Sequence, residues 1–399
     1  MADKQLYAFS KEAFELELDN IFGWWAQHMP DPTGNGFFGR VDGLGKVDVD
    51  ADKGVILNTR ILWACSAACR LGKTQYQPLA DKAYQYLLKH FVDPDFGGLY
   101  WSVNAHGVVV DAKKQVYAQA FGIYAFSEYY LLTGDKQALD LARSLFELLE
   151  TKAKDKKNFG YWEAKSQSWE PMEVVALSEK EGNDAKTMNT HLHVLEAYTN
   201  LYRCDQSKPI AKALSKLICL YVDKFVDLES KRLKLFFDEF WVENYTHESF
   251  GHEIESAWLL NEACEVLGDK VLQAQVNFVT IEIAYRVKAH GIDHKGAVYN
   301  DRFPDGTYHT ERDWWPQAEG VVGFFDAYQS SMDEELLETS SEIWNYIQLF
   351  QKDYENGEWY WGCDEDGNPI VNKDKAGLWK APYHNGRMCI EMIKRLSNN

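Results

Sequence analysis

One short pattern returns six times along this chain at a nearly constant interval. It usually begins with glycine, continues with a pair of aromatic or apolar residues and often ends in an Asp-Gly type of turn. The six copies begin at residues 36, 98, 160, 235, 296 and 357, so successive starts are 62, 62, 75, 61 and 61 residues apart. A period near 60 has room for two helices and one short hairpin, and it indicates a repetitive architecture. Six such helix pairs would close into a ring.

The segments between the copies have the periodicity of helices. Residues 118–132 are apolar on nearly every side, as expected for an inner helix, whereas residues 139–149 are amphipathic, as expected for an outer one. Gly134-Asp135 marks the boundary between them, because glycine favours the left-handed conformation that ends a helix. The sequence therefore predicts an all-α fold, an (α/α)6 barrel of six helical hairpins in a double ring. Short β-hairpins at one end would form the active-site funnel.

The repeat is unbroken, and no Ser/Pro-rich linker interrupts it. We therefore expect residues 1–399 to form a single (α/α)6-barrel catalytic domain. With 42 Lys and Arg against 61 Asp and Glu, the net charge is −19, which argues against nucleic acid or an anionic membrane surface as a partner. We expect a monomer that binds a small neutral ligand, because no exposed apolar stripe stands out in the sequence.

The sequence also bears on the cellular compartment. No stretch approaches the roughly 20 apolar residues of a membrane span, and the first residues lack the apolar core of a signal peptide. The seven cysteines are odd in number and scattered, which favours thiols in a reducing environment over disulfides. These features predict a cytoplasmic protein.

Three histidines from different repeats form the strongest candidate site. His193, His252 and His384 each lie near the junction between a loop and an inner helix, so their side chains are expected to converge on the barrel axis. His191 is two residues from His193, and residues at that spacing do not share a helix face. At most one of this pair should therefore face the axis.

Arg60 lies at a similar level, near the start of the first inner helix and within an apolar run. A buried arginine needs a partner, for which Glu255 is a candidate. A metal centre is not expected, because His252-Glu253 begins like the zinc motif HExxH but Ser256 stands where its second histidine would be.

These residue types favour one kind of chemistry. Histidine has an ordinary pKa near ~6.5 and can both accept and donate a proton at neutral pH. Two histidines on opposite sides of a carbon can remove a proton from one face and return one to the other, without a cofactor. Arginine can stabilise the enediolate that forms in between. Glycoside cleavage normally uses two carboxylates instead.

Four segments resemble the motifs of the N-acylglucosamine 2-epimerase superfamily, and within it the branch that acts on cellobiose. They are residues 58–60, 189–198, 251–255 and 379–387. The resemblance spans residues 36–387 and implies an (α/α)6 barrel that epimerises, without a cofactor, C2 of the reducing-end glucose of a disaccharide. It implies that His252 and His384 are the acid/base pair and that Glu255 orients His252. It also implies that His193 and Arg60 stabilise the enediolate. The resemblance further implies that Trp315 and Trp379 stack on the two sugar rings and that Tyr117 and Asn189 contact hydroxyl groups.

Three alternatives remain open at this point. Within the superfamily, the enzyme could be an N-acylglucosamine 2-epimerase or a mannose isomerase. An (α/α)6 glycoside hydrolase would share the barrel but would need carboxylates at the axis, such as Asp301, Asp313 or Glu319. A non-enzymatic sugar-binding protein would explain the aromatic residues and leave the three histidines without a role. The preferred disaccharide is also open.

Overall fold

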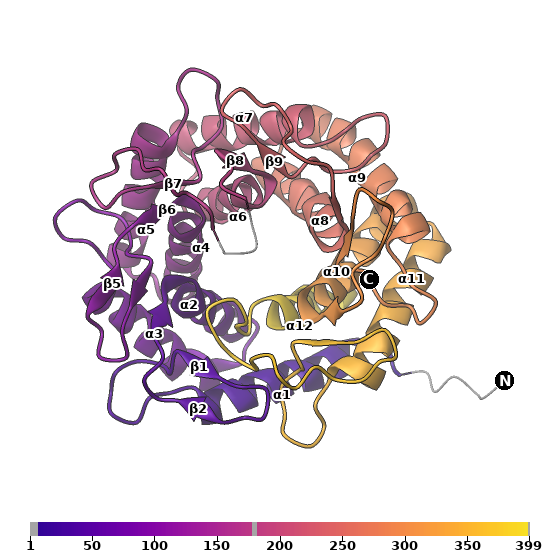
Figure 1. Ribbon diagram of the computed structural model, residues 1–399, viewed down its shortest axis with the longest axis horizontal. Helices are drawn as coiled ribbons and strands as arrows, with labels where there is room; N and C mark the ends of the chain where they lie inside the picture. The colour runs from indigo at the N-terminus through magenta and orange to yellow at the C-terminus, as the bar shows by residue number, and fades with distance from the viewer. Residues whose placement is uncertain (1–6, 178–181, 398–399) are drawn as a thin grey trace.

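The computed structural model describes residues 7–177 and 182–397. Within these ranges, twelve α-helices form two concentric rings around a common centre (Figure 1). The inner ring consists of α2 (Val55–Arg70), α4 (Val116–Thr133), α6 (Met188–Cys204), α8 (Phe250–Leu267), α10 (Trp314–Ser331) and α12 (His384–Ser397). The outer ring consists of α1 (Lys11–His28), α3 (Gln77–His90), α5 (Lys136–Leu148), α7 (Lys208–Lys224), α9 (Lys270–His290) and α11 (Glu334–Tyr346). The predicted (α/α)6 barrel is confirmed.

The pair α4 and α5 shows why the sequence forms two rings. The first fourteen residues of α4, 116–129, are all buried, because other helices pack on both of its sides. In α5 the buried residues lie on one face only. Gly134 ends α4 with a φ of 73°, and Asp135 caps α5 by accepting a hydrogen bond from the backbone N–H of Gln137.

Short strands lie at one end of the rings, as predicted, and they mostly connect neighbouring repeats. A two-residue strand precedes each of five inner helices and pairs antiparallel with the hairpin of the next repeat. The pairs are β3 (Lys53–Gly54) with β4 (Ser102–Val103), β6 (Lys114–Gln115) with β7 (Ala164–Lys165), β8 (Lys186–Thr187) with β9 (Phe236–Phe237), β10 (Glu248–Ser249) with β11 (Asp301–Arg302), and β12 (Arg312–Asp313) with β13 (Gly362–Cys363).

Two further strand pairs lie within single repeats: β1 (Arg40–Val41) pairs with β2 (Val47–Asp48), and β5 (Val109–Asp111) pairs with β4. The backbone N–H of Val41 also donates to the carbonyl of Ala376, at 2.8 Å. Ala376 lies in the loop before α12, so this contact joins the sixth repeat to the first. Three short helical turns complete the structure, at Thr74–Tyr76, Leu149–Ala153 and Ile347–Gln351.

Buried ion pairs fix the hairpins to the inner helices. Asp93 accepts the backbone N–H groups of its own turn and also binds Lys114 of the next strand, at 2.7 Å. In the fourth repeat Glu248 replaces the lysine or arginine and pairs instead with Arg286. The equivalent pairs in the other repeats are Asp31–Lys53, Asp155–Lys186, Asp293–Arg312 and Asp353–Lys375.

One sequence-based expectation about the surface was wrong. The outward face of α9 does carry an apolar stripe, in which Val271, Phe278 and Tyr285 are 71%, 65% and 37% exposed. Because α9 is apolar on both faces, the sequence alone does not reveal that one of them faces outward. All seven cysteines lie within the described ranges and are free thiols. Among the described helices, none combines the length and apolar character needed to cross a membrane.

Candidate active site

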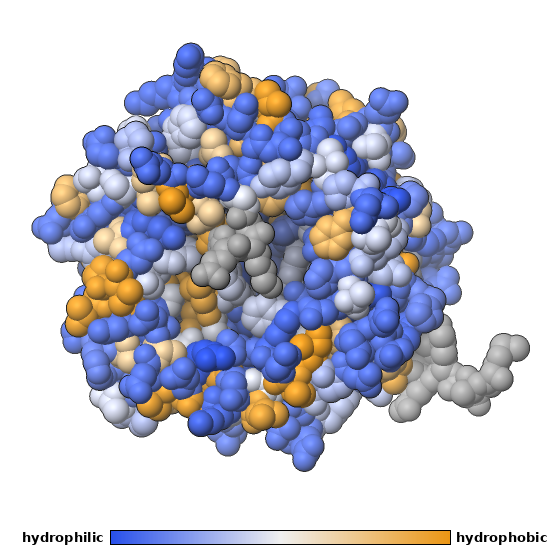
Figure 2. Space-filling model, viewed as in Figure 1, coloured by the Kyte–Doolittle hydropathy of each residue, from blue (hydrophilic) through white to orange (hydrophobic). Residues whose placement is uncertain are grey.

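A cavity of about 1130 Å³ opens at the strand end of the inner ring. It corresponds to the hollow at the centre of the face in Figure 2. All nine residues expected at the site line it: Arg60, Tyr117, Asn189, His193, His252, Glu255, Trp315, Trp379 and His384.

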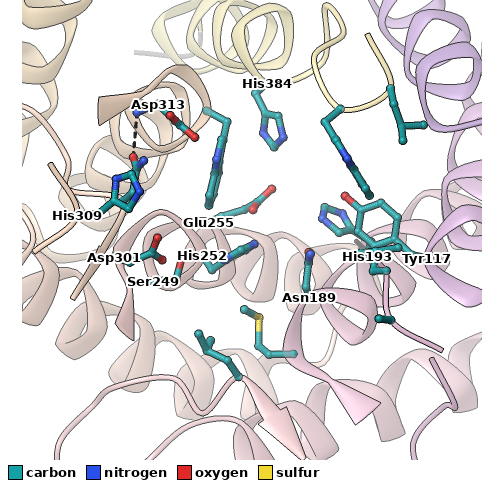
Figure 3. Close-up of a pocket in the computed structure, with 18 of the residues that line it drawn as sticks. Tyr117, Asn189, His193, Ser249, His252, Glu255, Asp301, His309, Asp313 and His384 are labelled. Atoms are coloured by element: carbon teal, nitrogen blue, oxygen red, sulfur yellow. Dashed lines mark hydrogen bonds between the residues drawn. The ribbon is translucent and has the colours of Figure 1, made fainter. Parts of the chain in front are cut away.

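The three histidines reach the cavity from three inner helices. His384 is the first residue of α12, His252 the third of α8 and His193 the sixth of α6, so they enter at different depths. Figure 3 shows His252 and His384 on different sides of the same space. His191 does not contribute, because its ring accepts the backbone N–H of Tyr161 at Nε2 and bonds the carbonyl of Thr187 at Nδ1.

Two of these histidines are anchored by carboxylates. Nδ1 of His384 lies 2.7 Å from Oε1 of Glu319, and Nδ1 of His193 lies 2.9 Å from Oε2 of Glu196. Each carboxylate accepts the Nδ1 proton and thereby fixes the tautomer in which Nε2 carries a lone pair. The indole of Trp258 donates to the second oxygen of Glu319, at 3.0 Å, which holds this dyad in place. His384 is therefore poised to act as a base through Nε2.

His252 has a different partner from the one implied by the resemblance. Its Nδ1 lies 2.8 Å from the hydroxyl oxygen of Ser249, whereas Glu255 binds Arg387. The expected role of Glu255 in orienting His252 is thus not found, since the buried carboxylate follows the stronger attraction of a guanidinium. A hydroxyl group either donates or accepts, so Ser249 is compatible with both tautomers of His252.

Arg387 joins the carboxylates beneath the histidines. Its guanidinium donates to Glu255 at 2.5 Å, to Glu319 at 2.7 Å and also to Glu196. The hydroxyl of Tyr383 donates to Glu196 as well. Arg387 is 1% exposed, and one cation faces three carboxylates here. A buried cluster of one guanidinium and three carboxylates has a net negative charge unless one of the carboxyl groups keeps its proton.

The pKa shifts agree with this charge balance. Burial raises the pKa of Glu255 to about 8, with the charge of Glu319 adding to the effect, and burial also raises the pKa of Glu319. For Glu196, burial acts upward, but Arg387 and His193 outweigh it and lower the pKa to about 2. At neutral pH the pair Glu255 and Glu319 therefore retains a proton.

The pKa values of the histidines shift in the opposite direction. Burial lowers the pKa of His252 to about 3 and also lowers the pKa values of His193 and His384, to which nearby cations contribute. The imidazoles are thus neutral at physiological pH, in the form required of a base.

Arg60 is held by aromatic residues and a backbone carbonyl rather than by Glu255, the partner considered from sequence. It donates to the carbonyl of Trp379 and to the hydroxyl of Tyr117, both at 2.8 Å. Its guanidinium lies between the rings of Phe121 and Tyr383, at 4.6 and 4.7 Å from their centroids. None of the described carboxylates pairs with Arg60, so its charge is available to a developing oxyanion.

The tryptophans form walls of the cavity. Trp315 lies beside His252 and His384, with ring centroids 4.6 and 5.7 Å away. Trp379 lies beside Tyr117 on the Arg60 side, at 6.1 Å. Both indoles are partly exposed, as needed for stacking on sugar rings.

A metal centre fits this geometry less well. Donor atoms of Glu255, Glu319 and His384 lie within 4.8 Å of one another, a spacing that a metal could use. However, Arg387 already supplies a fixed cation to both carboxylates. Of the carboxylates considered for a hydrolase, Glu319 is occupied by the same contacts, whereas Asp301 and Asp313 line the cavity.

Comparison with known proteins gives the family. Residues 36–386 match the model of the N-acylglucosamine 2-epimerase family, and the chain belongs to that family. It is 42% identical over 385 residues to the cellobiose 2-epimerase of Bacteroides fragilis, covering 96% of this chain and 98% of that relative. It is 40% identical to a cellobiose 2-epimerase of Ruminococcus albus, covering 94% and 96%. The solved cellobiose 2-epimerase of Bacillus thermoamylovorans superposes with a TM-score of 0.92 at 40% identity, covering 96% and 99% of the two chains.

Proposed function

We propose that this protein is a cellobiose 2-epimerase. It would interconvert glucose and mannose at the reducing end of β-1,4-linked disaccharides, turning cellobiose into glucosyl-mannose and lactose into epilactose without a cofactor. The observation that carries the proposal is the placement of His252 and His384 on the same cavity, each with Nδ1 anchored. The relatives named above support the same activity.

The mechanism follows from this placement. After the sugar ring opens, one histidine removes the C2 proton through Nε2, which leaves a cis-enediolate. Arg60 and His193 stabilise its oxygens. The opposite histidine, or the same one after rotation about C2–C3, returns a proton to the other face of C2. Protonation at C1 would instead give the ketose as a slow side product.

The substrate is bound by the cavity walls in this proposal. Trp315 and Trp379 would stack on the two sugar rings, while Tyr117 and Asn189 contact hydroxyl groups. Asn189 supports this role, because its side-chain oxygen is buried and accepts no hydrogen bond from the described residues. We further propose that residues 1–399 act as a single catalytic domain and that the protein is cytoplasmic, which its seven free thiols support.

The decisive experiment is NMR of the purified protein with cellobiose in D₂O, in the presence of EDTA. Glucosyl-mannose with deuterium at C2 would establish epimerisation by proton transfer. Free glucose would indicate a hydrolase. Turnover of mannose or N-acetylglucosamine, with none of cellobiose, would indicate one of the related monosaccharide enzymes.

Substitution of His384 then tests the mechanism. His384→Ala is expected to abolish turnover, because the base is lost together with the partner of Glu319. His191→Gln is a matched control, since His191 faces away from the cavity. Near-normal turnover in His384→Ala would rule out the proposed proton transfer.

A further inference from the structure

Three polar atoms on one wall of the cavity have no hydrogen-bond partner among the described residues. They are Oδ1 of Asp313 and the indole Nε1 atoms of Trp314 and Trp361, and all three are buried. Their residues line the cavity, but none has a role in the proposed reaction. Native proteins keep few buried polar atoms without a partner, because each one costs stability. A ligand that supplies the partners would explain why these three are kept.

Strand pairing brings the three residues together. The pair β12 and β13 sets Asp313 opposite Gly362, the neighbour of Trp361, and the backbone N–H of Trp314 donates to the carbonyl of Trp361 at 2.8 Å. The two indole rings are in T-shaped contact, with centroids 4.7 Å apart. Asp313 is the N-cap residue of α10, but its side chain caps no backbone N–H. One acceptor and two donors thus lie on the same wall.

The described neighbours of Asp313 do not occupy its Oδ1 atom. Nζ of Lys373 is 3.9 Å away, too far for a hydrogen bond, and it binds Glu311 instead. Burial raises the pKa of the Asp313 carboxyl, while Lys373 and the indole of Trp361 oppose this shift. Trp361 thus lies close to the carboxylate, although no hydrogen bond closes between the two. A hydroxyl group can accept from the indole N–H and donate to the carboxylate at the same time.

This wall lies across the cavity from the groups that hold the reacting oxygens in the proposed mechanism. In Figure 3, Asp313 and His193 lie on opposite sides, with His252 and His384 between them. The mechanism places C2 of the reducing sugar between His252 and His384, with its O1 and O2 atoms toward His193 and Arg60. The other end of the same sugar then extends toward Asp313. The hydroxyl group at that end is carried by C6.

We propose that Asp313 and Trp361 recognise the C6 hydroxyl group of the reducing-end sugar and thereby select a hexose over a pentose. The inference rests on the proposed function, since that function sets the orientation of the sugar. The hydroxyl accepts from the indole N–H of Trp361 and donates to Oδ1 of Asp313. Trp314 supplies a further donor beside them. The opened sugar is then held at both ends, which keeps C2 in place between the two histidines.

Two disaccharides that differ only at C6 of the reducing sugar test this assignment. They are cellobiose and 4-O-β-glucosyl-xylose, in which a hydrogen atom replaces the hydroxymethyl group. Deuterium incorporation at C2 in D₂O measures kcat/KM for both. We expect Asp313→Ala to lower kcat/KM for cellobiose about tenfold, as for the loss of a hydrogen bond to a charged group, and to leave that for glucosyl-xylose nearly unchanged. The wild type should prefer cellobiose by a similar factor.

The possible outcomes separate this inference from the function on which it rests. Equal losses for the two disaccharides in Asp313→Ala would overturn it, because a general effect on folding or on the histidines does not depend on C6. A wild type that is inactive on both disaccharides would overturn the proposed function as well. Glu311→Gln is the matched control, since Glu311 lines the same cavity but binds Lys373, and it should keep the wild-type preference.

Trp361→Phe provides an independent measurement, because it removes the N–H and keeps an aromatic ring. If both side chains bind one hydroxyl group, Asp313→Ala and Trp361→Phe together should lower kcat/KM for cellobiose little more than either does alone. Losses that multiply would show two separate contacts and would contradict the shared hydroxyl group.

Discussion

The hydroxyl oxygen of Ser249 lies 2.8 Å from Nδ1 of His252, where His193 and His384 have a carboxylate instead. Ser249 is the N-cap residue of α8, and its side chain caps no backbone N–H. It is free to hold the imidazole because it does not cap the helix. In the proposed mechanism, the histidines on the two sides of the reacting carbon thus have different partners.

Replacement of Ser249 tests whether this contact positions His252. We expect Ser249→Ala to lower kcat about tenfold, the lower end of the effect of removing the partner of a metal-binding histidine, with little change in KM. Ser249→Thr, which keeps the hydroxyl, should retain most of the rate. Ser66→Ala is a suitable control, because Ser66 is buried in α2 and does not line the cavity. Wild-type kcat in Ser249→Ala would contradict the role.

The pH dependence of kcat/KM should reflect the shifted pKa values of the histidines and carboxylates. The pKa values of His193, His252 and His384 are lowered, so the neutral bases persist as the pH falls through the ordinary value of about 6.5. On the alkaline side, the pKa of Glu255 near 8 marks the loss of the retained proton. We expect kcat/KM to stay high at pH 6 and to decline above about pH 8.

Initial rates between about pH 4 and pH 10 would check this profile. An acidic limb with its midpoint at or above 6.5 would contradict the lowered histidine pKa values. Whatever activity remains in Glu255→Gln should lack the alkaline decline, because that side chain has no proton to lose.

Replacement of Arg387 should destabilise the protein more than replacement of any other side chain of the site. Arg387→Met leaves three buried carboxylates without a cation, and we expect it to lose about 3–5 kcal/mol of unfolding free energy. Urea unfolding would measure the loss. Arg395→Met, at a more exposed ion pair with Asp326, should lose much less. Equal losses in the two variants would show that the carboxylates under the histidines do not depend on Arg387.

Glu253 should make stability depend on pH. It is completely buried, it accepts the backbone N–H of Leu233, and burial raises its pKa to about 7. A carboxyl whose pKa is raised on folding stabilises the protein below its unfolded value, about 4.5, and this contribution is lost as the pH rises through 7. Gln119 and Gln317 occupy the equivalent position in α4 and α10, where they pair with the same kind of backbone groups.

We therefore expect Glu253→Gln to be about 1–2 kcal/mol more stable than the wild type at pH 8 and about equally stable near pH 4.5. Arg286 keeps its second partner, Glu248, in this variant. Thermal unfolding at the two pH values would measure the difference. Glu262→Gln, on the same helix but partly exposed, should show no such gain, and a destabilised Glu253→Gln at pH 8 would contradict the expectation.

The sequence was sufficient for the barrel and for nine of the residues around the cavity, because both depend on local signals, whereas Ser249, His247 and His309 of the same cavity were missed. Turn glycines, such as the one at residue 98, return at a fixed period, and His252 and His384 stand at helix starts. The hydrogen-bond partners of the site residues could not be predicted from the sequence, since Glu319 and His384 are 65 residues apart and Glu196 and Arg387 are 191 residues apart. Such pairings depend on how inner helices face one another.

The exposed apolar residues of α9 were missed for a related reason. Val276 and Phe278 are two residues apart on a helix with apolar residues on two faces, and only the assembled ring decides that the first lies inside and the second outside. Periodicity identifies the two faces of a helix but not their environment.

The closure of the ring through α1 and α12 has a consequence for biosynthesis. The ribosome makes α1 before all other described helices, but its inner-ring partner emerges only after ten further helices. Until then the growing chain is an open arc, in which the apolar flank of α1 is uncovered and His384 is missing from the cavity. Folding by successive hairpins therefore ends with a long-range docking step. Catalysis begins only after that step.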